Sequence, residues 1–149
     1  MPRRVTKIVK MRKIDKIVVH HTASPNSWTY DDVRESHLQR GFDDIGYHYL
    51  IEHNGTVRLG RHVSRVGAHC KGFNASSVGV CVVGSFEDGS MPTEEQWDAV
   101  SSLCADLLRQ HPGSELFGHK ELKPTLCPGF DPQKLRDTIN LMECSDGSN

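Results

Sequence analysis

Apolar residues along this chain follow two kinds of pattern, continuous runs and helical spacing. The run at 14–20 contains three successive β-branched residues, and a second continuous run covers 78–83. Runs of this length and composition are typical of strands that are buried on both faces of a sheet. A shorter run at 116–117 also predicts a strand. The chain therefore contains strands of the kind that form the interior of a sheet.

Residues 46–59 have the pattern of a β-hairpin. Two apolar segments, 47–51 and 56–59, flank the pair Asn54-Gly55, which is the preferred sequence for a two-residue type I′ turn. Side chains alternate between the two faces of a strand. This alternation assigns Tyr47, Tyr49 and Ile51 to one face, and His48 and Leu50 to the other.

Three segments carry the signals of helices. Thr29 is a suitable N-cap for a helix that ends near Gly41. Residues 93–96 form a capping box, and apolar residues at helical spacing follow it. Asp131 and Pro132 suit the N-cap and the first position of the last helix.

Strands interleaved with helices predict an α/β fold. We expect a single domain whose central mixed sheet of about five strands is flanked by about three main helices. The domain covers 14–143. A basic segment at 1–13 precedes it as an arm or edge strand, and a short polar tail at 144–149 follows it.

The composition suits a folded protein of one domain. The chain has 149 residues, of which 25% are charged and 36% hydrophobic, and its formal net charge is −1. A protein of this charge is not built as a nucleic-acid binder. Residues 1–16 nevertheless carry seven basic side chains and one acidic one, which gives +6 and leaves −7 for the remainder. The basic segment is compatible with a solvated arm, and also with a contact surface for an acidic partner or an anionic envelope.

The sequence contains no targeting or membrane signal that we identify. No apolar h-region follows the basic N-terminus, so we expect no signal peptide. No apolar stretch approaches the ~18 residues of a membrane span. The five cysteines are odd in number and scattered, which favours reduced thiols over a disulfide framework. Cys81 and Cys104 occupy core positions of the predicted elements.

Two distant segments offer ligands for zinc. His119 and Cys127 are joined by a loop with two prolines, and imidazole nitrogen and thiolate sulfur are ligands that zinc binds readily. The pair His20-His21 ends the first strand, and alternation lets only one of the two face a given metal. His37 lies on the apolar face of a predicted helix, which favours packing over metal binding. These residues predict a zinc hydrolase.

Six sequence blocks occur in a fixed order along the chain. They are residues 18–23, 46–49, 54–57, 69–74, 78–84, and 118–119 with 127–131. Through these blocks the chain resembles the zinc-dependent N-acetylmuramoyl-L-alanine amidases, in particular the short phage enzymes. The family shares its fold with the peptidoglycan recognition proteins. The resemblance extends over about residues 14–141.

The resemblance implies the ligand set and the cofactor. It makes His20, His119 and Cys127 the ligands of one zinc ion per chain, with His21 facing away. Two neutral imidazoles and one thiolate leave the ion with a fourth position for water, which is the layout of a catalytic zinc site.

The resemblance also implies two catalytic residues. The active-site tyrosine of the family corresponds to Tyr47. Thr125 stands where the phage enzymes place a catalytic lysine, two residues before the cysteine; recognition proteins with amidase activity carry a threonine there. Lys123 is a nearby alternative source of positive charge.

A glycine-punctuated polar loop at 67–74 is expected to contact the substrate. The resemblance implies that His69 lines the substrate groove. Lys71 and Asn74, in the same loop, are further candidates for substrate binding.

These expectations combine into a function. The chain would hydrolyse the amide bond between N-acetylmuramic acid and L-alanine in bacterial peptidoglycan, as a monomeric phage endolysin. It would be made in the host cytoplasm and reach the cell wall through a separate pore protein. One alternative is a cytoplasmic amidase that recycles muropeptides.

Two further alternatives come from other classes of protein. A module that binds peptidoglycan without cutting it is disfavoured by Cys127, because the non-cutting relatives typically lack this ligand. An inhibitor of a phage RNA polymerase, a role known in the phage branch of the family, is compatible with amidase activity in the same chain.

Overall fold

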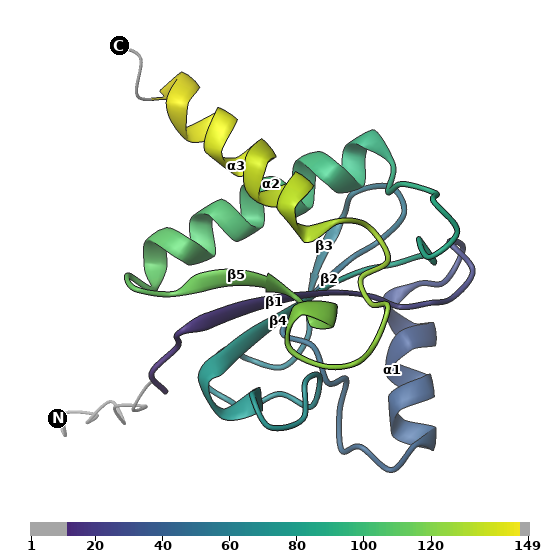
Figure 1. Ribbon diagram of the computed structural model, residues 1–149. Coiled ribbons are helices and arrows are strands. Elements are labelled where there is room, and N and C mark those ends of the chain that lie inside the picture. Colours follow the sequence, from purple (N-terminus) through teal and green to yellow (C-terminus); the bar gives the residue numbers. More distant parts are fainter. Residues whose placement is uncertain (1–11, 147–149) are drawn as a thin grey trace, which may run out of the picture.

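A mixed sheet of five strands forms the centre of the molecule. The computed structural model describes residues 12–146, with side chains for residues 12–143 (Figure 1). The strands are β1 (Lys16–His21), β2 (Tyr49–Ile51), β3 (Val57–Leu59), β4 (Ser77–Val82) and β5 (Glu115–Gly118), in the order β3-β2-β4-β1-β5. All neighbouring strands are parallel except β3, which is antiparallel to β2. The predicted α/β fold with a mixed sheet is confirmed.

Helices cover both faces of this sheet. The longer ones are α1 (Tyr30–Gln39), α2 (Glu94–Gln110) and α3 (Pro132–Asp146), and two short 3-10 helices are η1 (Asn74–Ser76) and η2 (His119–Glu121). Figure 1 shows α2 and α3 on one face of the sheet and α1 on the other.

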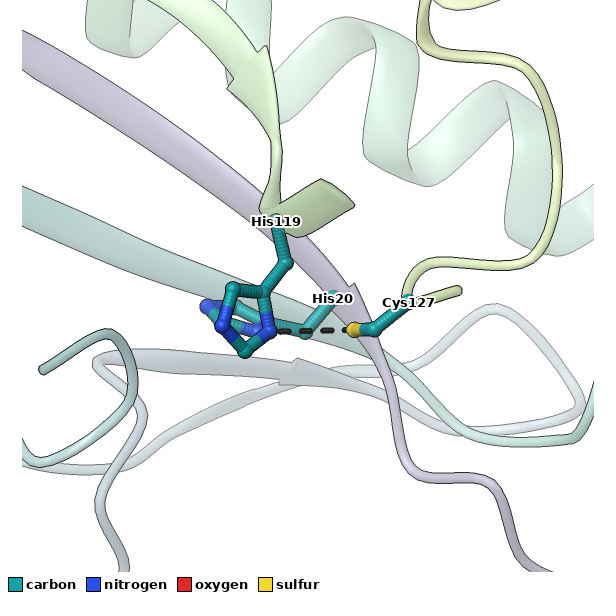
Figure 2. Close-up of side chains that lie close together, drawn as sticks. All are labelled: His20, His119 and Cys127. Carbon is teal, nitrogen blue, oxygen red and sulfur yellow. Dashed lines mark hydrogen bonds between the residues drawn. The ribbon is translucent and has the colours of Figure 1, made fainter. Parts of the chain in front are cut away.

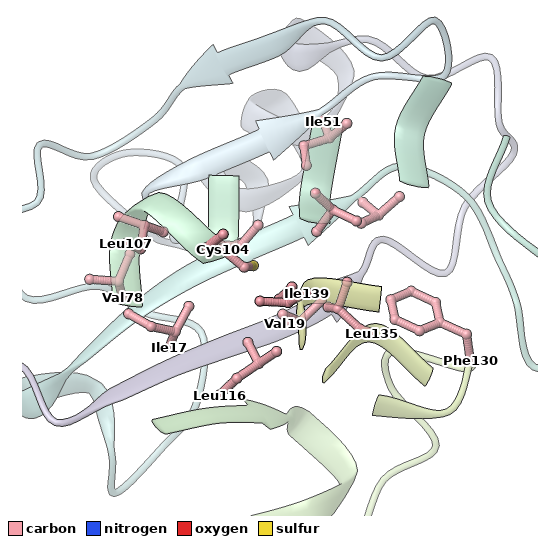
Figure 3. Packing of buried hydrophobic residues seen from close by; sticks show 14 of the residues in the cluster. Ile17, Val19, Ile51, Val78, Cys104, Leu107, Leu116, Phe130, Leu135 and Ile139 are labelled. Atoms are coloured by element: carbon pink, nitrogen blue, oxygen red, sulfur yellow. The ribbon is translucent and has the colours of Figure 1, made fainter. Parts of the chain in front are cut away.

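The larger hydrophobic core lies between the sheet and the pair α2 and α3 (Figure 3). Ile17 and Val19 of β1 and Val78 of β4 belong to this core. A smaller cluster on the opposite face joins Val33 of α1 to Cys81 of β4. Burying each such aliphatic side chain contributes about 1.5–3 kcal/mol. Burial on both faces explains why β1 and β4 are continuous apolar runs rather than alternating ones.

The predicted helix starts are present. Thr29 and Thr93 each accept a hydrogen bond from a backbone N–H one turn on, and both belong to complete capping boxes. The Asp131 carboxylate accepts a hydrogen bond from Gln133 N at 3.0 Å, as an N-cap does. These caps satisfy N–H groups that have no partner within the helix.

The hairpin turn differs from the prediction. Gly55 N donates to Glu52 O at 2.8 Å and Glu52 N donates to Thr56 O at 2.9 Å, so the loop has three residues instead of two. Gly55 has a φ of +89°, but Asn54 has no positive φ, and a type I′ turn needs one at both positions. The Asn54 side chain instead accepts the N–H of Thr56 at 2.9 Å. The prediction of a type I′ turn was wrong.

The face assigned to Tyr47 was also wrong. β2 begins only at Tyr49, and a bend at His48 precedes it. Tyr49 packs against the larger core, whereas Tyr47 packs with Leu50 against the smaller one. The bend interrupts the strand alternation, and it turns Tyr47 toward the face of the sheet that carries His20.

The ends of the domain differ from the predicted boundaries. Of the basic segment 1–13, residues 1–11 lie outside the described part, and residues 12–15 are not in a strand. Arg12 donates from Nε to Val63 O at 3.0 Å and from Nη1 to Asn74 O at 3.0 Å. At the other end α3 continues to Asp146, so residues 144–146 belong to the helix rather than to the polar tail.

Four cysteines have described side chains, and all four are buried and unbridged: Cys70, Cys81, Cys104 and Cys127. Cys81 and Cys104 are fully buried, as their core positions predict. Among the described residues, no helix is long and apolar enough to cross a membrane.

Candidate metal centre

Three side chains from distant segments meet at one edge of the sheet. His20 lies near the carboxyl end of β1, and His119 follows directly on the carboxyl end of β5. β1 and β5 are parallel neighbours, with Val19 opposite Gly118, so their carboxyl ends lie side by side. The loop after η2 then brings Cys127 to the same place (Figure 2).

The distances between these donors fit a zinc ion. His20 Nδ1 lies 3.6 Å from Cys127 Sγ, and the ligand atoms of all three residues lie within 4.8 Å of one another. Ideal Zn–N and Zn–S bonds at a tetrahedral angle would place nitrogen and sulfur about 3.6 Å apart. Donor types and spacing therefore suit zinc, and Nδ1 is the His20 atom that faces Cys127 Sγ.

Backbone groups hold the cysteine in position. His21 N donates to Cys127 Sγ at 3.3 Å, and Lys120 N donates to Cys127 O at 2.7 Å. An N–H directed at sulfur stabilises a thiolate more than a thiol, because the charged acceptor forms the stronger hydrogen bond. The loop is thus arranged for a deprotonated cysteine.

Burial sets the protonation states of the metal-free ligands. It lowers the pKa of His20 well below its usual value, with further lowering by His69 and His119. Burial, followed by the charge of Lys123, lowers the pKa of His119. Burial also raises the pKa of the Cys127 thiol to about 12. Without metal the site contains two neutral imidazoles and a protonated thiol.

His21 points away from the ligand cluster, in keeping with strand alternation. Its Nδ1 accepts a hydrogen bond from Phe86 N at 3.2 Å, so the proton resides on Nε2, which lies 3.1 Å from Glu87 Oε2. One histidine of the pair thus faces the metal position, and the other ties β1 to the loop that follows β4.

A cavity of about 250 Å³ lies against the ligands. Its remaining lining consists of His21, Ala23, His37, Arg40, Tyr47, Ala68, His69, Glu87 and Thr125. Neutral, cationic and anionic groups therefore border the space next to the donors. A substrate group placed there would contact the metal position from its accessible side.

Tyr47 and Thr125 both border this cavity. The Tyr47 ring lies 5.2 Å from the His20 ring, centroid to centroid. Burial raises the pKa of Tyr47 well above its usual value, so the phenol keeps its proton. Thr125 Oγ1 accepts a hydrogen bond from Cys127 N at 3.3 Å, which leaves its hydroxyl hydrogen available for another acceptor. Lys123 does not line the cavity.

The three loop residues expected at the substrate groove have different environments. His69 lines the cavity, and its Nδ1 lies 2.8 Å from His20 Nε2. Asn74 Oδ1 accepts hydrogen bonds from the backbone N–H groups of His69 and Cys70, at 2.9 and 2.8 Å, so it braces the loop. Lys71 is exposed, and neither Lys71 nor Asn74 lines the cavity.

Sequence reasoning did not place Glu87, Arg40 or His37 on the cavity wall. Glu87 follows β4, so its place beyond the carboxyl end of a central strand was the available signal. Arg40 caps α1, and no local pattern marks it. His37 was assigned to packing, and its Nδ1 does accept a hydrogen bond from Gly46 N at 2.8 Å, but the residue also borders the cavity.

Comparison with known proteins identifies the family. The model of the family described as N-acetylmuramoyl-L-alanine amidase matches residues 10–130. The chain belongs to this family. It is thus an amidase that cleaves the bond between N-acetylmuramic acid and L-alanine, as the sequence predicted.

Individual relatives agree with this assignment. The endolysin of Escherichia phage T7 is 39% identical over 139 residues, which cover 89% of this chain and 92% of the relative. Among solved structures, the amidase LysC from Clostridium intestinale has a TM-score of 0.81 at 32% identity, with 87% of each chain covered. Drosophila PGRP-LB has a TM-score of 0.71 at 27% identity, with 80% of this chain and 82% of that chain covered.

The number of protons released when zinc binds should report whether the Cys127 thiol is protonated in the metal-free amidase. At pH about 6.5 the lowered pKa values leave the imidazoles mostly neutral, whereas the raised pKa keeps the thiol protonated. We expect zinc binding to release about one proton at this pH, and more as bound water ionises near pH ~7. Calorimetry in buffers of different ionisation enthalpy measures this number.

The variant Cys127→Asp provides the matched control for this measurement. A carboxylate is already ionised at this pH. Zinc binding to the Cys127→Asp variant should therefore release almost no protons. Equal proton release by wild type and variant would contradict the assignment of Cys127 as the protonated ligand.

Proposed function

We propose that this amidase is a zinc enzyme and that it acts as a phage endolysin. His20, His119 and Cys127 would hold one zinc ion through two neutral nitrogens and a thiolate. The observation that carries the proposal is the convergence of these donors from distant segments beside a cavity. Three protein ligands with one accessible side are typical of catalytic rather than structural zinc.

The residues around the cavity have separate tasks in amide hydrolysis. Zinc, when bound, supplies a Lewis acid and lowers the pKa of a bound water toward ~7. Tyr47, which stays protonated, donates a hydrogen bond from Oη to the oxyanion that forms from the scissile carbonyl. Thr125 donates a second hydrogen bond from Oγ1, because this oxygen accepts from Cys127 N and keeps its own hydroxyl hydrogen for another acceptor.

The substrate has room to extend beyond the metal position. A second cavity is lined by Trp28, Pro25 and Ser36, and it shares Ala23, Arg40 and Tyr47 with the first. The two cavities are therefore neighbours that share part of their walls. Arg40 supplies positive charge in both parts, which suits the carboxylates of a stem peptide.

The decisive experiment joins metal analysis to an activity assay. We expect about one zinc per wild-type chain, and release of new L-alanine amino termini from purified sacculi. The variant Cys127→Ala should lose both, because two imidazoles alone hold zinc weakly. A variant that keeps stoichiometric zinc would contradict the ligand set. Preference for soluble anhydro-muropeptides over sacculi would favour the recycling amidase instead.

Tyr47 and Thr125 should contribute unequally. Tyr47→Phe removes a donor directed at the oxyanion and should lower kcat about 10²–10³-fold. Thr125→Val removes one neutral hydrogen bond and should lower kcat less than about tenfold. Zinc content should stay unchanged in both variants. Steady-state rates on sacculi test this order, and an equal or larger loss in Thr125→Val would contradict it.

The location of the enzyme follows from the endolysin role. It would be synthesised in the host cytoplasm and pass to the cell wall through a separate pore protein. Support comes from the phage relatives named as endolysins, four of which are matched over more than nine tenths of their length.

A phage RNA polymerase is a second proposed partner. The support is the resemblance to the phage branch of the family, together with the +6 charge of residues 1–16. A pull-down with the polymerase, using the chain with and without residues 1–13, tests this. Retention of the full chain alone would assign binding to the basic segment, and no retention in either case would remove the proposal.

A further inference from the structure

A chain of hydrogen-bonded polar side chains, called the file here, runs from His20 through His69 to Ser77. His20 Nε2 lies 2.8 Å from His69 Nδ1, and His69 Nε2 lies 3.2 Å from Ser77 Oγ. The two rings are nearly perpendicular, at 88° with centroids 4.9 Å apart. Ser77 is the first residue of β4 and is fully buried. These hydrogen bonds therefore join His20 on β1, through His69, to the first residue of the neighbouring strand β4.

The direction of the hydrogen bonds follows from the ligand atom. If His20 binds metal through Nδ1, its proton must reside on Nε2. That N–H donates to His69 Nδ1, which must then be an unprotonated acceptor. His69 carries its own proton on Nε2 and donates it to Ser77 Oγ. One tautomer of each histidine satisfies every polar contact along the file.

Glycines shape the slot that holds the His69 ring. A Cβ on Gly79 of β4 would lie 2.6 Å from His69 Cγ, and a Cβ on Gly67 would lie 2.7 Å from His69 Cδ2. Both distances are shorter than side-chain atoms tolerate, so the ring occupies space that any other residue at these positions would fill. Asn74 Oδ1 fixes the backbone of His69 from the far side. The orientation of His69 is thus determined by several independent contacts.

We propose that His69 is a positioning residue for the metal, which fixes the tautomer and the ring orientation of His20 through this file. The proposal rests on the zinc site proposed above. It gives His69 a task distinct from contact with the substrate. Ligating histidines usually donate their second N–H to a carboxylate, a carbonyl or water. Here a neutral imidazole, backed by a hydroxyl, takes that place.

Because His69 is a neutral acceptor, it adds no charge to the metal site. A carboxylate behind His20 would add a negative charge and make the imidazole a stronger donor to the metal. The His69 ring orients His20 without adding that charge. The ligand set and its support therefore keep a net charge of +1 with zinc, which favours ionisation of bound water.

The test measures zinc affinity by competition with a chelator, on metal-free protein that is reloaded. His69→Ala should weaken zinc binding about 10- to 100-fold. His69→Asn, which places Oδ1 where Nδ1 lies, should recover part of this loss. His62→Ala is the matched control, because His62 is exposed and its side chain hydrogen-bonds within its own loop, to Ser64. It should bind zinc as the wild type does.

Other outcomes separate the possible roles of His69. If His69 only lined the groove, His69→Ala would raise KM at unchanged zinc affinity. If it only packed, the melting temperature of the metal-free protein would fall at unchanged zinc affinity. Either result would overturn the proposal. If instead Cys127→Ala kept its zinc, the zinc site itself would fail, so the two failures are distinguishable.

Two measurements keep the proposal testable if His69→Ala does not fold. Long-range ¹H–¹⁵N NMR on the zinc-loaded wild type should show protons on Nε2 of both His20 and His69. A proton on His69 Nδ1 would overturn the proposal. Gly79→Ala displaces the His69 ring without removing a ligand, so it should also weaken zinc binding. A folded Gly79→Ala protein that binds zinc with wild-type affinity would contradict the role of the His69 ring.

Discussion

Parallel pairing of β1 with its two neighbours is the constraint on which the site depends. Parallel strands about 4.8 Å apart bring their carboxyl ends to the same edge of the sheet. The register of Val19 with Gly118 sets His20 beside His119, although the two are far apart along the chain. Pairing with β4 likewise sets Cys81 opposite His20 and places Ser77 at the start of the same strand. Packing of the larger core against the other face of β1 holds this arrangement rigid.

The end of β1 uses both of its faces. His20 points to the metal position, while His21 bonds to Glu87 and Phe86 on the other side. The backbone between them contributes as well, because His21 N donates to Cys127 Sγ. The left-handed φ of +54° at Ala23 then turns the chain along the cavity wall. A short stretch of sequence thus supplies a ligand, a support for the thiolate and a part of the cavity.

Sequence patterns predicted those elements whose formation depends on residues close together in the chain. The buried strands and the Thr29 and Thr93 caps were recognised because apolar runs and capping boxes depend on neighbouring residues. The cluster of His20, His119 and Cys127 was predicted from residue chemistry and family resemblance together. The orientation of Tyr47 was missed because a bend at His48 is set by hydrogen bonds to other segments, such as His48 N to Gly79 O at 2.9 Å. Arg40 was missed for the same reason, since only the tertiary fold brings it to the cavity.

Two neutral groups near the metal position change the chemistry in opposite directions. Thr125, where the resemblance to the phage enzymes implies a lysine, is a neutral donor in place of a cation that would stabilise an oxyanion. His69 stands where a carboxylate often supports a ligating histidine, which removes an anion that would reduce the Lewis acidity of the metal. Loss of a positive charge on one side is offset by absence of a negative charge on the other. In the proposed zinc site the electrophilic strength would come from the ligand set and from the protonated Tyr47, with Arg40 as the cation on the cavity wall.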